Sequence, residues 1–356
     1  MKYKNPDIIL LFAILALSGI GILMVFSSSM YMAAAAGKSL YGPLLKQSVA
    51  ALIGFILMIV FMKIDYHYLR KYAFVFYVIT LVLLIAVLFI GKDVQGAKRW
   101  LFGFQPSELS KLALIIVLAV YLSEVGSGMR YFWLGIGIPM LVFIPIGFLI
   151  MKEPDLGTTI AIFATIIVMM VIAGARWAHL GLIFALSLVV FAILIVVEPY
   201  RWRRIISYLD PNSDPLDAGY QIIQSLYGLG SGGLFGVGLG KGRQKLHYLP
   251  QPHSDFIFTT LGEEWGFIGT SVVVGLFFVL AWRGYKIAIE CGDAFGSLLA
   301  AGITSLITVQ AAINIGVVTA TLPTTGITLP FISSGGTSLV VNLIGLGILL
   351  NISKQS

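Results

Sequence analysis

Cysteine, histidine and charge are scarce in this chain of 356 residues. The single cysteine, Cys291, excludes a disulfide within the chain and a metal site built from several cysteines. Lys, Arg, Asp and Glu together make up 11% of the residues, against 58% for hydrophobic residues, which is far too apolar for a soluble fold. No low-complexity tail or large soluble domain interrupts the chain. These absences favour one integral membrane domain over residues 1–356.

Long apolar runs dominate the sequence instead. A helix of about 20 apolar residues can cross the ~30 Å hydrocarbon core of a bilayer. Solid runs such as YVITLVLLIAVLFIG do not alternate as membrane-barrel strands do. We therefore predict an all-α polytopic membrane protein with about ten transmembrane helices, at roughly 8–27, 44–63, 72–91, 108–124, 131–151, 157–174, 178–197, 264–285, 294–320 and 331–352. Because nine more runs follow the first, we do not expect that run to be a cleaved signal peptide.

The even number of helices places both termini on one side of the membrane. The connections near 28–43, 92–107, 152–156, 198–263 and 321–330 lie on the opposite side. Leaving out the long loop 198–263, which the positive-inside rule discounts, ten Lys and Arg lie on the terminal side and seven opposite. We therefore expect cytoplasmic termini. The positive charges on the outer side favour an anionic ligand such as a pyrophosphate. The alternative is that they arose by random drift in a basic chain of net charge +7.

Polar residues collect in these outer connections. The segment GKDVQGAKRWLFGFQPSELSKLAL contains Lys98, Arg99 and Trp100, and its Pro-Ser pair predicts a helix start. Trp100 alone would suit an interfacial anchor. Glu108 and Lys111 are three residues apart on one helix face. They form a structural ion pair, face an aqueous cavity, or do both.

Two further segments are unusually polar. MKEPDLGTT places Lys152, Glu153 and Asp155 in a turn that needs only its proline and glycine. Gln310 and Asn314 lie four residues apart on the ninth expected helix. They either join helices by hydrogen bonds or line a cavity. The segment TATLPTTGITLPFISSGGTS, with Thr325, Ser333 and Ser334, offers main-chain amides that bind anions at a helix start.

The loop 198–263 is long enough to be functional. RRIISYL suits an amphipathic helix on the membrane surface, and AGYQIIQSLYGLG suits a short helix on or in the bilayer. The glycine pattern starting at Gly228 has dinucleotide-motif spacing but lacks the strand–turn–helix context, and Lys241 lacks the rest of a phosphate loop. We expect no nucleotide site and no nucleic-acid partner.

Eight segments together resemble the SEDS family (shape, elongation, division and sporulation proteins), which polymerise peptidoglycan. They occur in order along the whole chain: GAKRW, QPSELSKLA, EPDLGT, DPNSDPLDAGYQIIQS, GRQKLHYLPQPHSDFIF, GEEWGFIG, NIGVV and LPTTGITLPFISSGG. The chain looks more like the FtsW and SpoVE branch than the RodA branch. Ser254, Gln251 and Ser334 depart from the usual family residues, which leaves every acid and base in place.

The resemblance implies an inverting glycosyl transfer at the outer face of the cytoplasmic membrane. The acceptor 4-hydroxyl of one lipid II attacks the anomeric carbon of the donor chain, and undecaprenyl pyrophosphate leaves. Asp255 matches the family's general base, although a helix N-cap is the alternative for such a residue. Burial would raise the pKa of this carboxyl, so nearby cations must keep it ionised. Glu263 and Glu264 suit a helix start.

Eight basic side chains are candidates to hold the pyrophosphate: Lys98, Arg99, Lys111, Lys152, Arg201, Arg204, Arg243 and Lys245. A divalent cation, Mg or Mn, could share that role, although the sequence offers no compact set of oxygen ligands. His253 orients the substrate or simply lines the loop.

The resemblance also implies a partner, a single-span class B penicillin-binding protein, together with other divisome or elongasome membrane proteins. Division, sporulation and cell-shape roles all stay open. A lipid II flippase is the alternative function. It predicts charges through the depth of the bundle and inverted repeats, and the sequence shows neither. A scaffold would leave the outer carboxylates and cations without a purpose.

Overall fold

The computed structural model describes residues 5–35, 37, 39–94, 97–214, 217–246, 249 and 252–355, so Gln251 lies outside the described residues. Each predicted apolar run forms a helix: α1 (Ile8–Ala35), α2 (Gly42–Lys63), α3 (His67–Ile90), α4 (Pro106–Val125), α5 (Ile138–Lys152), α6 (Leu156–Ile172), α7 (Trp177–Val197), α10 (Ile257–Glu290), α11 (Ala294–Val318) and α12 (Gly336–Gln355). In the described chain, nine helical segments are long and apolar enough to span a membrane. α6, with 17 residues, is only about 26 Å long. The predicted all-α polytopic membrane fold is confirmed.

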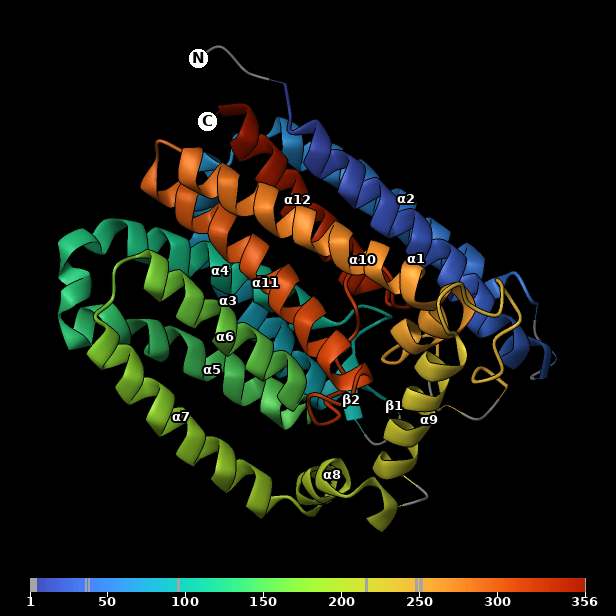
Figure 1. The fold of residues 1–356 in the computed structure, drawn as a ribbon. Helices are drawn as coiled ribbons and strands as arrows, with labels where there is room; N and C mark the ends of the chain where they lie inside the picture. The colour runs from blue at the N-terminus through green and yellow to red at the C-terminus, as the bar shows by residue number, and fades with distance from the viewer. Residues whose placement is uncertain are drawn as a thin grey trace.

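The helices form one bundle in which α11 and α12 are the most buried. α12 lies against α2, α10 lies against α1 and α11, and α7 stands apart on one side (Figure 1). Lipid gives helices no hydrophobic reason to associate, so close packing depends on small residues. At Gly347 of α12, an added Cβ would lie 2.5 Å from the carbonyl oxygen of Met58 in α2. Only glycine therefore permits this approach.

The two termini lie together at one end of the bundle, and the hairpin and α8 lie at the other (Figure 1). The hairpin consists of β1 (Lys92–Val94) and β2 (Ala97–Trp100), paired antiparallel. The sequence did not predict it, because strands of three and four residues are too short to show alternation.

The long segment between α7 and α10 contains both helices that the sequence predicts. α8 (Pro199–Leu209) is the amphipathic one, and α9 (Ala218–Ser231) is the second. Three short helical segments complete the described structure: the 3₁₀ helices η1 (Gly126–Arg130) and η3 (Pro211–Ser213), and the π-helix η2 (Trp133–Gly137). The expected boundary at 263 differs from the structure, since α10 already begins at Ile257.

α10 is broken at Gly266, where φ is 68° and ψ is −164°. The glycine-rich loop after α9 supplies main-chain partners for the break, as a non-helical backbone at membrane depth requires. Four hydrogen bonds join the loop to the break: Val237 N–H to Glu263 O (3.0 Å), Gly238 N–H to Glu264 O (3.1 Å), Phe267 N–H to Gly233 O (2.8 Å) and Ile268 N–H to Leu234 O (3.1 Å). The run of glycines thus serves packing against a broken helix.

Candidate functional site

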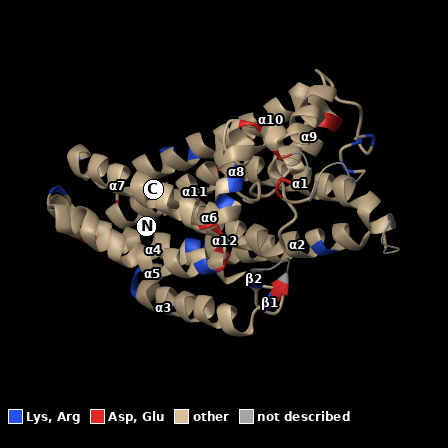
Figure 2. Cartoon of the chain, turned by 90° about the horizontal axis from the view of Figure 1, so that it is seen from below, with Lys and Arg blue, Asp and Glu red and all other residues tan. Residues whose placement is uncertain are grey.

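A cavity of about 960 Å³ opens where β2, α4, α6, α8, α11 and the segments preceding α10 and α12 converge. Most helical ribbon carries no charge, whereas α8 contributes a basic segment (Figure 2). Eleven of the predicted site residues line the cavity: Arg99, Trp100, Glu108, Asp155, Arg201, Arg204, His253, Asp255, Gln310, Thr325 and Ser334. The fold therefore brings together residues spread over most of the sequence.

Three consecutive main-chain carbonyl groups, ending with that of Asp255, each accept a hydrogen bond that fixes this segment. Asn314 of α11 and two serines before α12 donate these bonds: Ser334 N–H to His253 O (2.9 Å), Ser333 Oγ to Ser254 O (2.7 Å) and Asn314 Nδ2 to Asp255 O (2.8 Å). Asn314 Nδ2 also donates to Ile327 O at 2.7 Å. Of the two expectations for Asn314, the structure shows the joining role, and it fixes the position of Asp255.

The carboxyl group of Asp255 is partly buried in the cavity wall. Its Oδ1 accepts a hydrogen bond from Ser254 Oγ at 2.8 Å. It does not cap α10, because the cap position is Phe256 and has no side-chain bond. Burial raises the pKa of Asp255, the Ser254 bond lowers it, and Asp155 raises it. Arg204 and Arg99 lower this pKa, as the sequence argument requires of nearby cations.

Arg99 and Arg204 are each anchored to main-chain carbonyls. Arg99 donates from Nε to Glu153 O (2.7 Å) and from Nη2 to Pro154 O (2.6 Å). Arg204 donates from Nη1 to Thr324 O at 3.2 Å. A guanidinium group has five N–H donors, so both side chains keep donors for a ligand. Neither arginine forms an ion pair with a carboxylate among the described residues.

Arg201 lies three residues before Arg204 on the same face of α8. It donates from Nε to Tyr200 Oη (2.9 Å) and from Nη1 to Leu194 O (3.0 Å). Both guanidinium carbons lie over the Tyr200 ring, 5.3 and 5.9 Å from its centroid. Tyr200 is a site residue that the sequence analysis missed. Its position directly before Arg201 was the available signal.

Glu108 and Lys111 form the ion pair that the sequence left open, with 2.7 Å between Oε2 and Nζ. Glu108 also lies in the cavity wall, while Lys111 is 1% exposed. Both expected roles therefore coexist for Glu108. Lys111 is neutralised by its partner and lies behind the wall.

Several buried polar atoms at the cavity have no hydrogen-bond partner among the described residues: His253 Nδ1, Gln310 Oε1, Thr324 Oγ1 and Thr325 Oγ1. Burial lowers the pKa of His253, so the imidazole is neutral near pH 7. Unpaired polar atoms of this kind are costly unless a ligand or water bonds to them. The cavity is therefore suited to a polar ligand rich in hydroxyl groups.

Asp155 caps α6 with its carboxylate. It accepts hydrogen bonds from Thr158 N–H (3.0 Å) and Thr158 Oγ1 (2.9 Å). Its side chain also lies in the cavity wall, where its negative charge raises the pKa of Asp255. The neighbouring Glu153, to which the sequence analysis assigned no role, is 0% exposed.

Besides Lys111, four predicted pyrophosphate ligands do not line the cavity: Lys98, Lys152, Arg243 and Lys245. Lys245 is 3% exposed, with Nζ 2.6 Å from Glu264 Oε1 and 3.0 Å from Ser27 Oγ of α1. The Lys152 Nζ lies over the Phe148 ring. We leave these four residues out of the site.

Glu263 and Glu264 do not start a helix, in contrast to the expectation, because they end the first segment of the broken α10. Glu263 accepts hydrogen bonds from the main-chain N–H groups of Arg243 (2.7 Å) and Gln244 (3.1 Å). Both glutamates hold the glycine-rich loop in place. Their partners lie about twenty residues away in sequence, so no local pattern revealed them.

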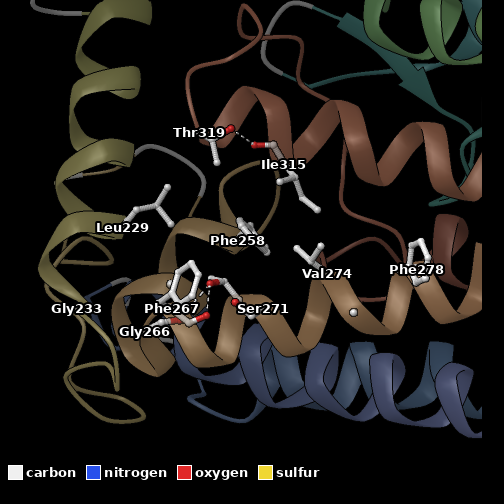
Figure 3. A pocket seen from close by; sticks show the side chains of 13 residues that line it. Leu229, Gly233, Phe258, Gly266, Phe267, Ser271, Val274, Phe278, Ile315 and Thr319 are labelled. Atoms are coloured by element: carbon white, nitrogen blue, oxygen red, sulfur yellow. Dashed lines mark hydrogen bonds between the residues drawn. The ribbon is translucent and has the colours of Figure 1, made fainter.

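A second cavity of about 780 Å³ lies between α9, α10 and α11 (Figure 3). Its described lining includes Leu229, Phe258, Phe267 and Phe278, and none of the described lining residues is charged. This cavity lacks groups for acid–base chemistry. The charged cavity around Asp255 is the candidate active site.

The comparisons with known proteins agree along the whole chain. A family model described as "Cell cycle protein", named for FtsW, RodA and SpoVE, matches residues 8–356. Stage V sporulation protein E of Bacillus subtilis (strain 168) is 45% identical over 362 residues, covering 100% of this chain and 99% of that protein. A probable peptidoglycan glycosyltransferase FtsW of Geobacter sp. (strain M18) is 43% identical, covering 99% and 98%.

Two solved structures are similar in fold. One belongs to work described as "Structural coordination of polymerization and crosslinking by a peptidoglycan synthase complex", with TM-score 0.82, 31% identity and 99% coverage of both chains. The other is the rod shape determining protein RodA of Thermus thermophilus, with TM-score 0.73, 28% identity, and coverage of 98% and 97%.

Proposed function

We propose that this chain, which belongs to the FtsW, RodA and SpoVE family of cell cycle proteins, polymerises lipid II at the outer face of the cytoplasmic membrane. Its relatives show that it is a peptidoglycan glycosyltransferase. The observation that supports this most directly is the position of Asp255. Its carboxyl group lies in a large cavity beside Arg99 and Arg204, which lower its pKa and form no ion pair with a carboxylate among the described residues. A base and an anion-binding group are the two elements that this transfer requires.

In the proposed reaction, Asp255 removes the proton from the acceptor 4-hydroxyl as its oxygen bonds to the donor's anomeric carbon. The bond from that carbon to the pyrophosphate oxygen breaks, and undecaprenyl pyrophosphate leaves with both electrons. The anomeric centre inverts, and Asp255 then releases the proton to water. Since Ser254 occupies Oδ1, the other oxygen, Oδ2, is the one that accepts the proton.

Arg99, Arg201 and Arg204 are proposed to hold the leaving pyrophosphate. All three line the cavity and are anchored by neutral partners. The described part of the chain contains no group of three or more His, Cys, Asp or Glu side chains that could hold a metal. These residues do not fit a protein-held cation. Chelation in the polymerisation assay tests whether Mg or Mn accompanies the pyrophosphate.

The chain is a multi-pass membrane protein. We further propose that its termini are cytoplasmic and that the cavity faces outwards, where lipid II is consumed. A class B penicillin-binding protein is the proposed partner. This agrees with the likeness to a chain from a peptidoglycan synthase complex.

The deciding experiment uses purified protein with labelled lipid II, alone and with its cognate transpeptidase. The wild type should make glycan strands. Asp255→Asn, which keeps the shape of the side chain but not its basicity, should lose at least about 100-fold in rate. Glu124→Gln, on the opposite side of the membrane from the proposed site, is the matched control and should stay active.

Two outcomes would overturn the proposal. Normal polymerisation by Asp255→Asn would remove Asp255 as the base. Movement of lipid II across vesicles by a wild type that never polymerises it would replace the enzyme with a flippase.

A further inference from the structure

Glu153 is a fully buried carboxyl group beside the active site that the proposed mechanism does not use. It directly follows α5 and is 0% exposed. Neither of its carboxyl oxygens has a hydrogen-bond partner among the described residues. Arg99 contacts this residue through the main-chain carbonyl, at 2.7 Å, and gives its second bond to Pro154 O. The guanidinium group therefore does not form an ion pair with the carboxyl.

An ionised carboxylate that is buried without hydrogen bonds is costly, so such a group stays protonated. Burial, the largest cause, and the nearby Asp155 together raise the pKa of Glu153 to about 8, although Arg99 acts to lower it. Two charged groups on neighbouring segments thus act on Glu153, Arg99 from β2 and Asp155 at the start of α6. Lys152, the last residue of α5, places its Nζ over the Phe148 ring. Near pH 7, Glu153 is mostly neutral.

The neutral state matters because of where Arg99 lies. Arg99 lines the cavity and also acts on the pKa of Asp255. A negative charge on Glu153 would partly cancel the field of Arg99 and add to that of Asp155. An anionic ligand in the cavity would then meet a less positive wall.

We propose that Glu153 is a positioning residue that must be neutral, so that Arg99 presents an uncompensated positive charge to the pyrophosphate of the lipid-linked substrate. Ionisation of Glu153 in mildly alkaline solution then weakens pyrophosphate binding without touching Asp255. This inference rests on the proposed glycosyltransferase function.

The test measures binding of undecaprenyl pyrophosphate to the purified full-length protein from about pH 6.5 to about pH 9. Wild-type affinity should fall by roughly tenfold across this range. Glu153→Gln, which cannot ionise, should keep its neutral-pH affinity throughout. Glu124→Gln is the matched control and should follow the wild type.

A wild type that binds no pyrophosphate at any pH would defeat the proposed function itself. If the wild type binds but Glu153→Gln loses affinity as the wild type does, only the role of Glu153 is overturned. The same conclusion follows if wild-type affinity does not change with pH.

A second measurement needs no stable variant at Glu153. Infrared difference spectra of the Asp255→Asn variant, in which Glu153 is unchanged, should show a protonated carboxylic acid that disappears as the pH rises through about 8. The lack of any such titrating band would overturn the inference.

Discussion

Asp255 and Glu153 are two carboxyl groups near one cavity, and different neighbouring groups act on their pKa values. Burial raises the pKa of both. Ser254, Arg204 and Arg99 each lower the pKa of Asp255, whereas only Arg99 lowers the pKa of Glu153. The proposed roles differ in the same sense, with Asp255 as the base and Glu153 as a protonated acid.

Arg204→Gln should shift the pH dependence of polymerisation. Asp255 acts as a base only when ionised, so activity is lost as the pH falls through its pKa. Because Arg204 lowers that pKa, removing its charge raises it, and the acidic limb of kcat/KM moves to higher pH. The pH profile of Arg203→Gln, an exposed neighbour on α8, should match the wild type. If the acidic limb does not move, Arg204 does not act on the pKa of Asp255.

Asn314→Leu should impair catalysis more than substrate binding. The change removes the hydrogen bonds to Asp255 O and Ile327 O, leaving two buried carbonyls unsatisfied at about 1–3 kcal/mol. We expect kcat to fall by about tenfold, because the base is misplaced, and KM to change less. Gln310→Leu is the comparison, since Gln310 lines the cavity and should act mainly on KM. Equal effects of the two variants would contradict a positioning role for Asn314.

The element that presents Asp255 is the first segment of α10, ahead of the break at Gly266. Its far end is held by the glycine-rich loop, and its side chains reach α9 and α1. Thr259 bonds to Ser225 at 2.7 Å, and Glu264 bonds to Ser27. An unbroken membrane helix would have needed none of these partners. The break therefore couples the glycine-rich loop to the position of the Asp255 carboxyl group.

Glu264→Gln should destabilise the protein without affecting the ligand contacts of the cavity. It leaves the Lys245 ammonium group buried and unpaired, which costs about 3–5 kcal/mol. Thermal unfolding in detergent should show a clear drop in Tm, and the double variant Lys245→Met with Glu264→Leu should recover part of it. Pyrophosphate affinity of the remaining folded protein should be unchanged. A selective loss of affinity would instead return Lys245 to the list of ligands.

At the scale of the whole molecule, the termini and the hairpin end of the bundle lie at opposite ends (Figure 1). The proposed topology makes Leu209, exposed at the end of α8, an outer residue. Ile289, exposed near the end of α10, becomes a cytoplasmic one.

Labelling of single cysteines tests this topology in intact cells. With Cys291 replaced by Ser, a membrane-impermeant maleimide should label Leu209→Cys directly. It should label Ile289→Cys only after permeabilisation. The reverse pattern would invert the topology and place the cavity in the cytoplasm.

The class of the molecule was determined by the sequence alone, because the length of an apolar run is a local property. Each run expected to cross the membrane became a helix, and eight short segments spread along the chain carried the family resemblance. The helices of the outer loop were also predictable, since an amphipathic pattern is visible within a few turns. The hairpin was not, because its strands are too short.

Only the tertiary structure decided which charges meet. Among eight equivalent basic candidates, it places Arg99, Arg201 and Arg204 at the cavity and buries Lys245 against Glu264. It also bonds the Asn314 side chain to the main chain of Asp255, and it buries the Glu153 carboxyl group without a hydrogen-bond partner in the described part of the chain. These outcomes depend on contacts between residues far apart in sequence. The free energy of burying a charge is set by those contacts, and no local pattern encodes them.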